Sequence, residues 1–163
     1  MKKFIKLLNG KGEGNMSAAQ AFYQELELDV LARTLWGEAR GEGVQGMEAV
    51  ACVILNRVKV ADEKGGQYWW GNNVISVCQK PYQFSCWNRS DANYKRVQAV
   101  TQKTDIHFAT SMRVARRALA GVLNDQTGGA THYHEQSIMP DWALGQTPSA
   151  HIGQHIFYKL TGV

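Results

Sequence analysis

The stretch Leu31-Ala-Arg-Thr-Leu-Trp-Gly-Glu-Ala-Arg-Gly-Glu42 constrains the fold of this chain more than any other. Gly37 is expected to end or bend a helix there, and Glu38 follows at once. A carboxyl group beside an apolar helix end can be held partly buried in a cleft, where burial raises its pKa and keeps it protonated near neutral pH. The alternative is that Glu38 and Glu42 are solvated charges. The core-facing stripe that predicts the helix, at i, i+3, i+4 and i+7, is formed by Leu28, Leu31, Ala32 and Leu35.

The same stretch opens a longer segment, residues 31–58, which reads LARTLWGEARGEGVQGMEAVACVILNRV. This segment resembles the SleB/CwlJ-type cell wall hydrolases, whose signature is a Gly-Glu-Ala-Arg-Gly-Glu segment leading into a helix that ends in Asn-Arg-Val. Weaker similarities follow in the family's order at residues 77–85, 128–134 and 152–157. The resemblance therefore covers roughly residues 27–160, and its first block is the specific one.

Length and composition fit one globular domain. The chain has 163 residues, of which 44% are hydrophobic and 20% charged, and no apolar run is long enough to cross a bilayer. The net charge of +4 favours a polyanionic partner, such as nucleic acid, a membrane surface or a bacterial wall polymer. There is no zinc-finger spacing and no aromatic strand typical of RNA binding. We therefore expect a monomer that binds peptidoglycan glycan strands, with no nucleic-acid partner and no stable membrane insertion.

The N-terminus imitates an export signal without completing one. Its start is positively charged, but Lys6 interrupts the apolar run and no small-residue cleavage site follows. Residues 1–16 are interpreted as a flexible arm and residues 17–163 as a single catalytic domain. An enzyme acting on the wall, in the periplasm or outside the cell, would then be made in the cytoplasm. A phage holin or cell lysis would release it.

The pattern along the chain predicts a mainly helical α+β protein. Helices are expected at residues 18–25 with a cap at Ser17, at 28–37, at 44–60, from Ser90 or Asp91 to 100, and from Thr104 or Asp105 to 122. Residues 74–77 are either helix or strand, and strands are expected at 130–135 and 152–160. The family resemblance implies a lysozyme-like domain in which a helical core and a small β lobe enclose a cleft.

The resemblance makes Glu38 the catalytic residue. SleB-like enzymes are lytic transglycosylases, in which one glutamate first donates a proton to the bond between N-acetylmuramic acid and N-acetylglucosamine and then accepts one. The C6 hydroxyl of the muramic acid attacks its own C1, so no water and no cofactor are needed. A muramidase would hydrolyse the same bond with a second carboxylate, for which Glu48 and Asp91 are candidates.

Two further charged residues have both structural and functional interpretations. Glu42 would lie one helical turn beyond Glu38 if the helix continued, where it could bind substrate. It could equally pair with Arg40 or cap the next helix, where a carboxylate is favourable. The Asn56-Arg57 pair ends that helix, and a structural role is favoured for Arg57 because a cation suits a helix C-terminus.

Sugar binding requires aromatic faces and groups that bond ring hydroxyls. The loop residues Gln83, Phe84 and Ser85 match the family loop beside the catalytic glutamate, so Gln83 is expected to bond an N-acetyl group and Phe84 to carry a sugar ring. Tyr133 matches a family strand near the cleft. Each of these residues also fits ordinary packing. Further candidates for stacking on sugars are Trp69, Trp70 and Trp142.

His132 and His134 alternate in an expected strand and would share one face. We assign them to substrate binding, with structural and metal-binding roles left open, because the family varies at these positions. A zinc-dependent peptidoglycan amidase could use them with His151 and His155 as further ligands. A non-catalytic wall-binding module is a third hypothesis, supported by the basic charge and the aromatic residues.

The cysteine count is three, which is odd. Cys52 lies in a helical apolar run and is interpreted as a core thiol. Cys78 and Cys86 flank a loop and could close a small disulfide ring, although a reducing cytoplasm would keep them as thiols. The sequence leaves the bonding of this pair open.

Overall fold

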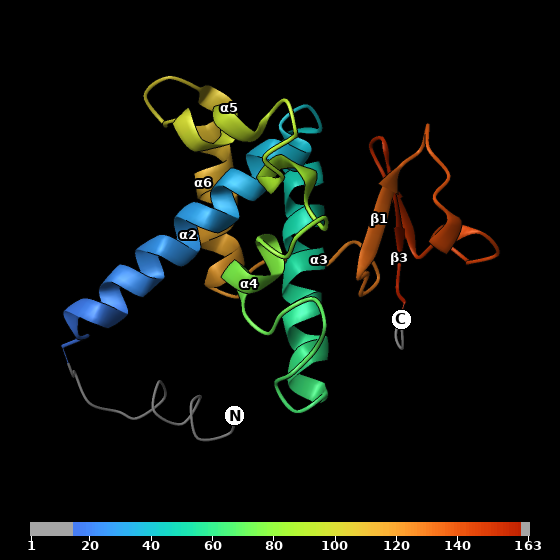
Figure 1. The fold of residues 1–163 in the computed structure, drawn as a ribbon, viewed down its shortest axis with the longest axis horizontal. Coiled ribbons are helices and arrows are strands. Elements are labelled where there is room, and N and C mark those ends of the chain that lie inside the picture. The colour runs from blue at the N-terminus through green and yellow to red at the C-terminus, as the bar shows by residue number, and fades with distance from the viewer. Residues whose placement is uncertain (1–14, 161–163) are drawn as a thin grey trace.

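The computed structural model describes residues 15–160, so most of the predicted N-terminal arm (1–16) lies outside the described residues. The other helices and a small antiparallel sheet lie on opposite sides of the long helix α3 (Figure 1). The helical lobe contains α2 (Ala18–Ala39), α3 (Gly43–Glu63), α4 (Val74–Cys78), η1 (Ser85–Trp87), α5 (Tyr94–Ala99) and α6 (Ile106–Leu119). The β lobe contains β1 (His132–Glu135), η2 (Asp141–Ala143), β2 (Ala150–Ile152) and β3 (His155–Tyr158).

Helix α2 begins where the sequence predicts and ends later than predicted. Ser17 caps it by accepting a hydrogen bond from the backbone of Gln20, whose side chain bonds back to Ser17. The two short helices expected on either side of residue 26 form one helix, because Leu26 and Glu27 are both good helix formers. The helix also continues through Gly37 to Ala39, which places Glu38 in its last turn.

Three of the remaining element predictions are decided by where the helices begin. Asp105 caps α6 through the backbone N–H of Phe108, which confirms one of the two expected starts. Asn93 precedes α5 without a side-chain cap, so neither Ser90 nor Asp91 opens that helix. The ambiguous segment at residues 74–77 is the helix α4, which Asn73 caps.

Helix α3 contributes to two hydrophobic cores. Val50 and Ile54 belong to the larger core, which α3 shares with the other helices. Ala49 and Val53 belong to a second core with Phe157 of the sheet. The relative position of the two lobes is therefore set by the packing on α3.

The sheet has the order β1-β3-β2, and both pairings are antiparallel. The single strand expected at residues 152–160 is instead the β2–β3 hairpin, because the chain reverses at Gly153, whose φ of +58° favours glycine. Side chains alternate along β1, so Tyr133 faces α3 together with Phe157. His132 and His134 face the other side of the sheet.

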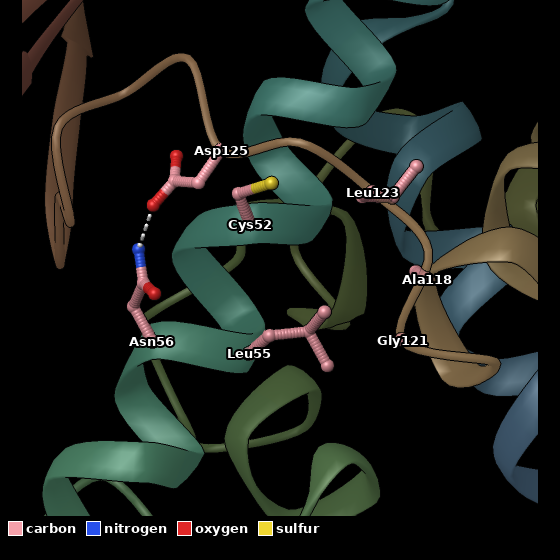
Figure 2. A pocket seen from close by; sticks show the side chains of 7 residues that line it. All are labelled: Cys52, Leu55, Asn56, Ala118, Gly121, Leu123 and Asp125. Atoms are coloured by element: carbon pink, nitrogen blue, oxygen red, sulfur yellow. Dashed lines mark hydrogen bonds between the residues drawn. The ribbon is translucent and has the colours of Figure 1, made fainter.

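A polar contact joins the loop after α6 to α3. Asn56 donates a hydrogen bond to Asp125 at 3.0 Å beside a small pocket of about 180 Å³, which Cys52 also lines (Figure 2). Burial alone would raise the pKa of Asp125, but hydrogen bonds from Thr127, Asn56 and the Gly129 backbone outweigh it and lower that pKa. The loop that leads into β1 is thus held against α3.

Two further points concern the possible disulfide bond and the possibility of a membrane-spanning helix. Cys52, Cys78 and Cys86 are all buried free thiols, so the possible Cys78–Cys86 disulfide is not formed. Within residues 15–160, no helix has both the length and the apolar character needed to span a membrane.

Candidate active site

Glu38 lies at the end of α2, where the helical lobe meets the sheet. Its Oε2 accepts a hydrogen bond from the Tyr133 hydroxyl at 3.0 Å. Its Oε1 is shielded from solvent and has no hydrogen-bond partner among the described residues. The two residues are 95 positions apart in the chain, so the lobe packing brings them together.

Burial dominates the electrostatics of this carboxyl group and raises the pKa of Glu38 above its ordinary value. The Tyr133 hydroxyl and the thiol and backbone N–H of Cys86 partly offset this effect, and the charge of Asp91 adds to it. The pKa of Tyr133 is itself raised well above its usual value by burial and by the neighbouring Glu38 carboxylate. Tyr133 therefore keeps its proton and remains a hydrogen-bond donor to Glu38.

An open groove of about 380 Å³ runs past Glu38 between the lobes. One wall is the turn from α2 to α3, and the other is formed by the ends of β1 and β3. A carboxyl group held in such a groove with a raised pKa can act as a general acid toward a bound substrate. The residues that line the groove are Gly37, Glu38, Arg40, Gly41, Glu42, Glu135 and His155.

The absence of a side chain at Gly37 allows α2 and η1 to approach each other closely beside Glu38. A Cβ at position 37 would lie 2.7 Å from Cys86 Cβ and 2.8 Å from its Sγ, distances that real side chains do not adopt. The missing side chain therefore lets the η1 segment contact α2 one residue before Glu38. From the sequence, this glycine is expected only to end or bend the helix, and Cys86 has no expected role at the site.

Glu42 lines the groove but neither caps α3 with its side chain nor pairs with Arg40. Its Oε2 accepts a hydrogen bond from the backbone N–H of Gln154 at 3.0 Å, in the turn between β2 and β3. Arg40 instead donates to Asn93 at 2.8 Å and lies over the ring of Trp36. Glu42 thus connects the two walls of the groove.

His155 lines the groove, although the sequence suggests only a possible metal-binding role for it. Its ring packs edge-on against Tyr133, with centroids 4.9 Å apart, and its Nδ1 is buried without a hydrogen-bond partner among the described residues. Burial lowers the pKa of His155, although the charges of Glu42 and Glu135 oppose this. The Ile-Gly-Gln-His pattern could have suggested the site, but not the contact with Tyr133.

The loop expected to bind sugar lies differently from the prediction. Gln83 accepts a hydrogen bond from the buried Arg57 at 3.1 Å. Phe84 is only 2% exposed and belongs to the helical core, so its ring is not open for stacking on a sugar. Ser85 is exposed, and none of the three residues lines the groove.

His132 and His134 are not brought to the acid. His132 is bonded to the Thr131 hydroxyl, and His134 to the Tyr158 hydroxyl and the Glu135 carbonyl. Both rings pack against Trp142 on the face of the sheet opposite Tyr133. Their position therefore does not support the expected role in substrate binding. Strand alternation predicts only that the two residues share a face, whereas the packing of the sheet on α3 decides which face meets the groove.

The other aromatic candidates divide between core and surface. Trp70 is fully buried and donates to the backbone oxygen of Arg57, whereas Trp69 is 43% exposed. Trp142 packs against the Tyr158 ring. None of these tryptophans lines the groove beside Glu38.

The side chains for a zinc site are not assembled in the described part of the chain. Residues 15–160 hold no group of three or more His, Cys, Asp or Glu side chains placed to share a metal ion. Ring nitrogens of His132 and His134 already form hydrogen bonds within the β lobe. The amidase hypothesis therefore lacks the ligand set it requires.

The pattern of the Cell Wall Hydrolase family matches residues 41–158, which is more than half of the chain. The chain therefore belongs to this family of enzymes. The match begins just after Glu38 and includes Tyr133 and the groove residues of the sheet.

The curated relatives are spore cortex-lytic enzymes. That of Halalkalibacterium halodurans is 31% identical over 140 residues, covering 84% of this chain and 36% of that protein. That of Bacillus cereus is 29% identical over 140 residues, covering 84% of this chain and 46% of the relative. The chain thus spans less than half the length of these relatives.

Solved structures give the same answer for the fold. The catalytic domain of the germination-specific lytic transglycosylase SleB from Bacillus anthracis superposes with a TM-score of 0.62 at 25% identity, covering 93% of this chain and 98% of that domain. The catalytic domain of Bacillus cereus SleB gives 0.63 at 26% identity, with 92% and 100% covered. The predicted SleB/CwlJ-type, lysozyme-like α+β domain is confirmed.

Proposed function

We propose that this domain cleaves the glycan strands of bacterial peptidoglycan between N-acetylmuramic acid and N-acetylglucosamine, as a lytic transglycosylase. The observation that carries the proposal is the Glu38 carboxyl group, which is shielded from solvent beside an open groove and has a raised pKa. Likeness to SleB, whose solved domain is described as a lytic transglycosylase, supports the reaction type. The enzyme would act on the wall, outside the cytoplasmic membrane.

The proposed reaction uses one carboxyl group twice. Glu38 gives its proton to the glycosidic oxygen as the bond to C1 of the muramic acid breaks. The resulting carboxylate then takes the proton from the C6 hydroxyl of the same sugar, whose oxygen bonds to C1. The products are a 1,6-anhydro end and a free hydroxyl on the departing sugar, and Glu38 is again protonated.

Tyr133 has a positioning role in this scheme. Its hydroxyl donates to Oε2, so Oε1 is the carboxyl oxygen that has no hydrogen bond among the described residues. The bond also favours the carboxylate form, which limits how far burial raises the pKa of Glu38. The acid is therefore held in one orientation and remains able to accept a proton in the second step.

Hydrolysis of the same bond is the second candidate, because other carboxylates line the groove. Glu42 stands on the helix wall and Glu135 on the sheet wall, and either would be a candidate to activate a water molecule. The two carboxylates named from the sequence are placed less favourably. Glu48 forms an ion pair with Arg117, and Asp91 accepts a hydrogen bond from the Asn93 backbone.

Digestion of purified peptidoglycan followed by mass spectrometry tests the proposal. Wild-type protein should release fragments with anhydromuramic ends, and Glu38→Gln should release none while keeping its circular dichroism spectrum. Glu63→Gln, an exposed position at the end of α3, is the matched control and should keep wild-type activity. Reducing ends would establish hydrolysis instead, and retained activity in Glu38→Gln would refute Glu38 as the acid.

The type of wall preferred is a separate question, which the same assay answers. The relatives are described as spore cortex-lytic enzymes, so cortex and vegetative peptidoglycan should be digested side by side. A strong preference for cortex would extend the likeness from fold to substrate. Equal rates would place the specificity outside this domain.

A further inference from the structure

Two neighbouring side chains in the C-terminal half of α3 hold the segment that leads into β1. Asn56 donates to the carbonyl of Ala130 at 2.9 Å, and the Nε of Arg57 donates to the carbonyl of Thr131 at 2.8 Å. Consecutive side chains thus bind consecutive carbonyls. Asn56 also donates to Asp125, which accepts from the loop before Ala130 (Figure 2).

Arg57 reaches a third segment from the same place. One of its terminal nitrogens donates to Oε1 of Gln83 at 3.1 Å. Its guanidinium lies 5.1 Å from the ring centroid of Trp70 and 5.6 Å from that of Phe84. The three segments α3, β1 and the loop before η1 therefore meet at one side chain.

This arrangement is energetically unusual. Arg57 is 6% exposed, and within residues 15–160 no carboxylate lies within ion-pair distance of it. Burial lowers its pKa to about 10. A buried cation satisfied only by neutral oxygens and aromatic rings contributes little net stability to the fold. Stability therefore does not explain why an arginine occupies this position.

The two segments that Arg57 holds both continue to the acid. Thr131 stands two residues before Tyr133, whose hydroxyl bonds Glu38. Gln83 stands three residues before Cys86, which faces the same carboxyl group. A shift of the guanidinium would move both neighbours of Glu38 at once.

We infer that Arg57 is a positioning residue for the proposed reaction: it fixes Tyr133 and Cys86 around the Glu38 carboxyl group, with Asn56 sharing the task at β1. Arg57 itself touches neither Glu38 nor the groove. The inference rests on the proposed role of Glu38. Supporting side chains of this kind hold catalytic groups within a fraction of an ångström of the productive geometry.

Carbon-13 NMR titration of the Glu38 carboxyl group tests this role without relying on activity. The resonance is assigned by its loss in Glu38→Gln. Arg57→Met should raise the pKa of Glu38 further, because a displaced Tyr133 no longer stabilises the carboxylate. The other titratable groups that face Glu38 are Cys86, Asp91 and Cys78, which the substitution leaves in the chain.

A double-mutant cycle separates positioning from general destabilisation. Tyr133→Phe should raise the same pKa, and adding Arg57→Met to it should raise it by less than Arg57→Met does alone, since only the contribution of Cys86 is then left to lose. Arg57→Met should also lower the rate of peptidoglycan digestion at least about tenfold. Arg113→Met, which removes an exposed arginine of α6, is the matched control and should change neither quantity.

Arg57→Lys keeps the charge but can serve fewer acceptors, so it should give an intermediate pKa and partial recovery of the rate. This variant and Asn56→Ala carry the test if Arg57→Met does not fold. An unchanged Glu38 titration in the folded variants would overturn the positioning role and leave the proposed function intact. Retained activity in Glu38→Gln would overturn the proposed function, whatever the titration shows.

Discussion

Replacing Gly37 with alanine tests whether the site depends on the close approach of α2 and η1. The added Cβ would lie 2.7 Å from Cys86 Cβ, 2.8 Å from its Sγ and 3.2 Å from Val97 Cγ2. The Cβ of Cys86 is bonded directly to the backbone, so it cannot rotate away. Ordinary contact begins at 3.4 Å, so the two segments must separate by about 0.7 Å.

Two opposing contributions decide the effect on stability. Alanine is favoured over glycine inside a helix by about 1 kcal/mol. Overpacking a buried contact costs about 1–3 kcal/mol, and here the rigid Cys86 Cβ places the cost in the middle of that range. We therefore expect Gly37→Ala to lower the free energy of unfolding by about 1 kcal/mol. Because Cys86 faces Glu38, activity should fall about tenfold or more.

Urea denaturation and the clearing of peptidoglycan suspensions measure the two effects. Gly41→Ala is the matched control, because a Cβ there meets nothing within 4 Å, and its stability should stay within about 0.5 kcal/mol of wild type. Adding Cys86→Gly to Gly37→Ala removes both clashing atoms and should restore part of the loss. A Gly37→Ala protein as stable and as active as wild type would refute this account of the site.

Four further predictions concern titration and thiols. Activity should fall as the pH rises through the raised pKa of Glu38, and Tyr133→Phe should move this limb of the pH–rate profile upward. The raised pKa of Glu38 stabilises the fold below about pH 4.3, and this stabilisation is lost as the pH rises through that pKa. Glu38→Gln should therefore have a higher urea midpoint than wild type, and the difference should be larger at pH 8 than at pH 4. Burial lowers the pKa of His132 to about 4, so the unfolded chain binds more protons between pH 6.5 and 4, and thermal stability should decline across that window; His132→Gln should flatten the decline. Burial raises the pKa of Cys52 and Cys78 to about 12, so iodoacetamide should label the native protein far more slowly than the urea-unfolded one, and dithiothreitol should leave the melting temperature unchanged.

The helical part of the fold follows closely from local sequence signals. The caps Ser17 and Asp105 and the apolar stripe of α2 are short-range features, and the structure contains them. The errors occur where a longer context decides. The β2–β3 hairpin depends on a reversal at Gly153, which is one glycine among many in the sequence.

In the candidate site, too, the features that depend on neighbouring residues are predictable and the contacts between distant residues are not. The position of Glu38 beside an apolar helix end was open to prediction, because the stripe and the charge are adjacent in sequence. Its hydrogen bond to Tyr133 joins residues 95 positions apart, and no periodic pattern in the sequence indicates it. The alternation of His132 and His134 correctly predicts that they share a face, but the core on α3 decides which face that is.

Phe84 illustrates why aromatic loop residues are difficult to assign. An aromatic residue in a polar loop is a reasonable sugar-stacking candidate, but here the loop is held against the helical core by Arg57 and by the contact of η1 with α2. Phe84 is buried as a result. The contact of η1 with α2 that follows Phe84 in the chain is possible because Gly37, which is remote in sequence, has no side chain.

The acidity of Glu38 is therefore a property of how the lobes pack rather than of the segment that carries it. Burial where the two lobes meet raises the pKa, and the β lobe supplies the Tyr133 hydroxyl that limits the rise. Loosening the lobes would admit water, which removes the cause of the raised pKa together with the bond that orients the carboxyl group. A fold that needs a proton donor at this position must consequently keep the lobe contacts fixed, and a buried Arg57 bonded to both neighbouring segments is a direct way to do so.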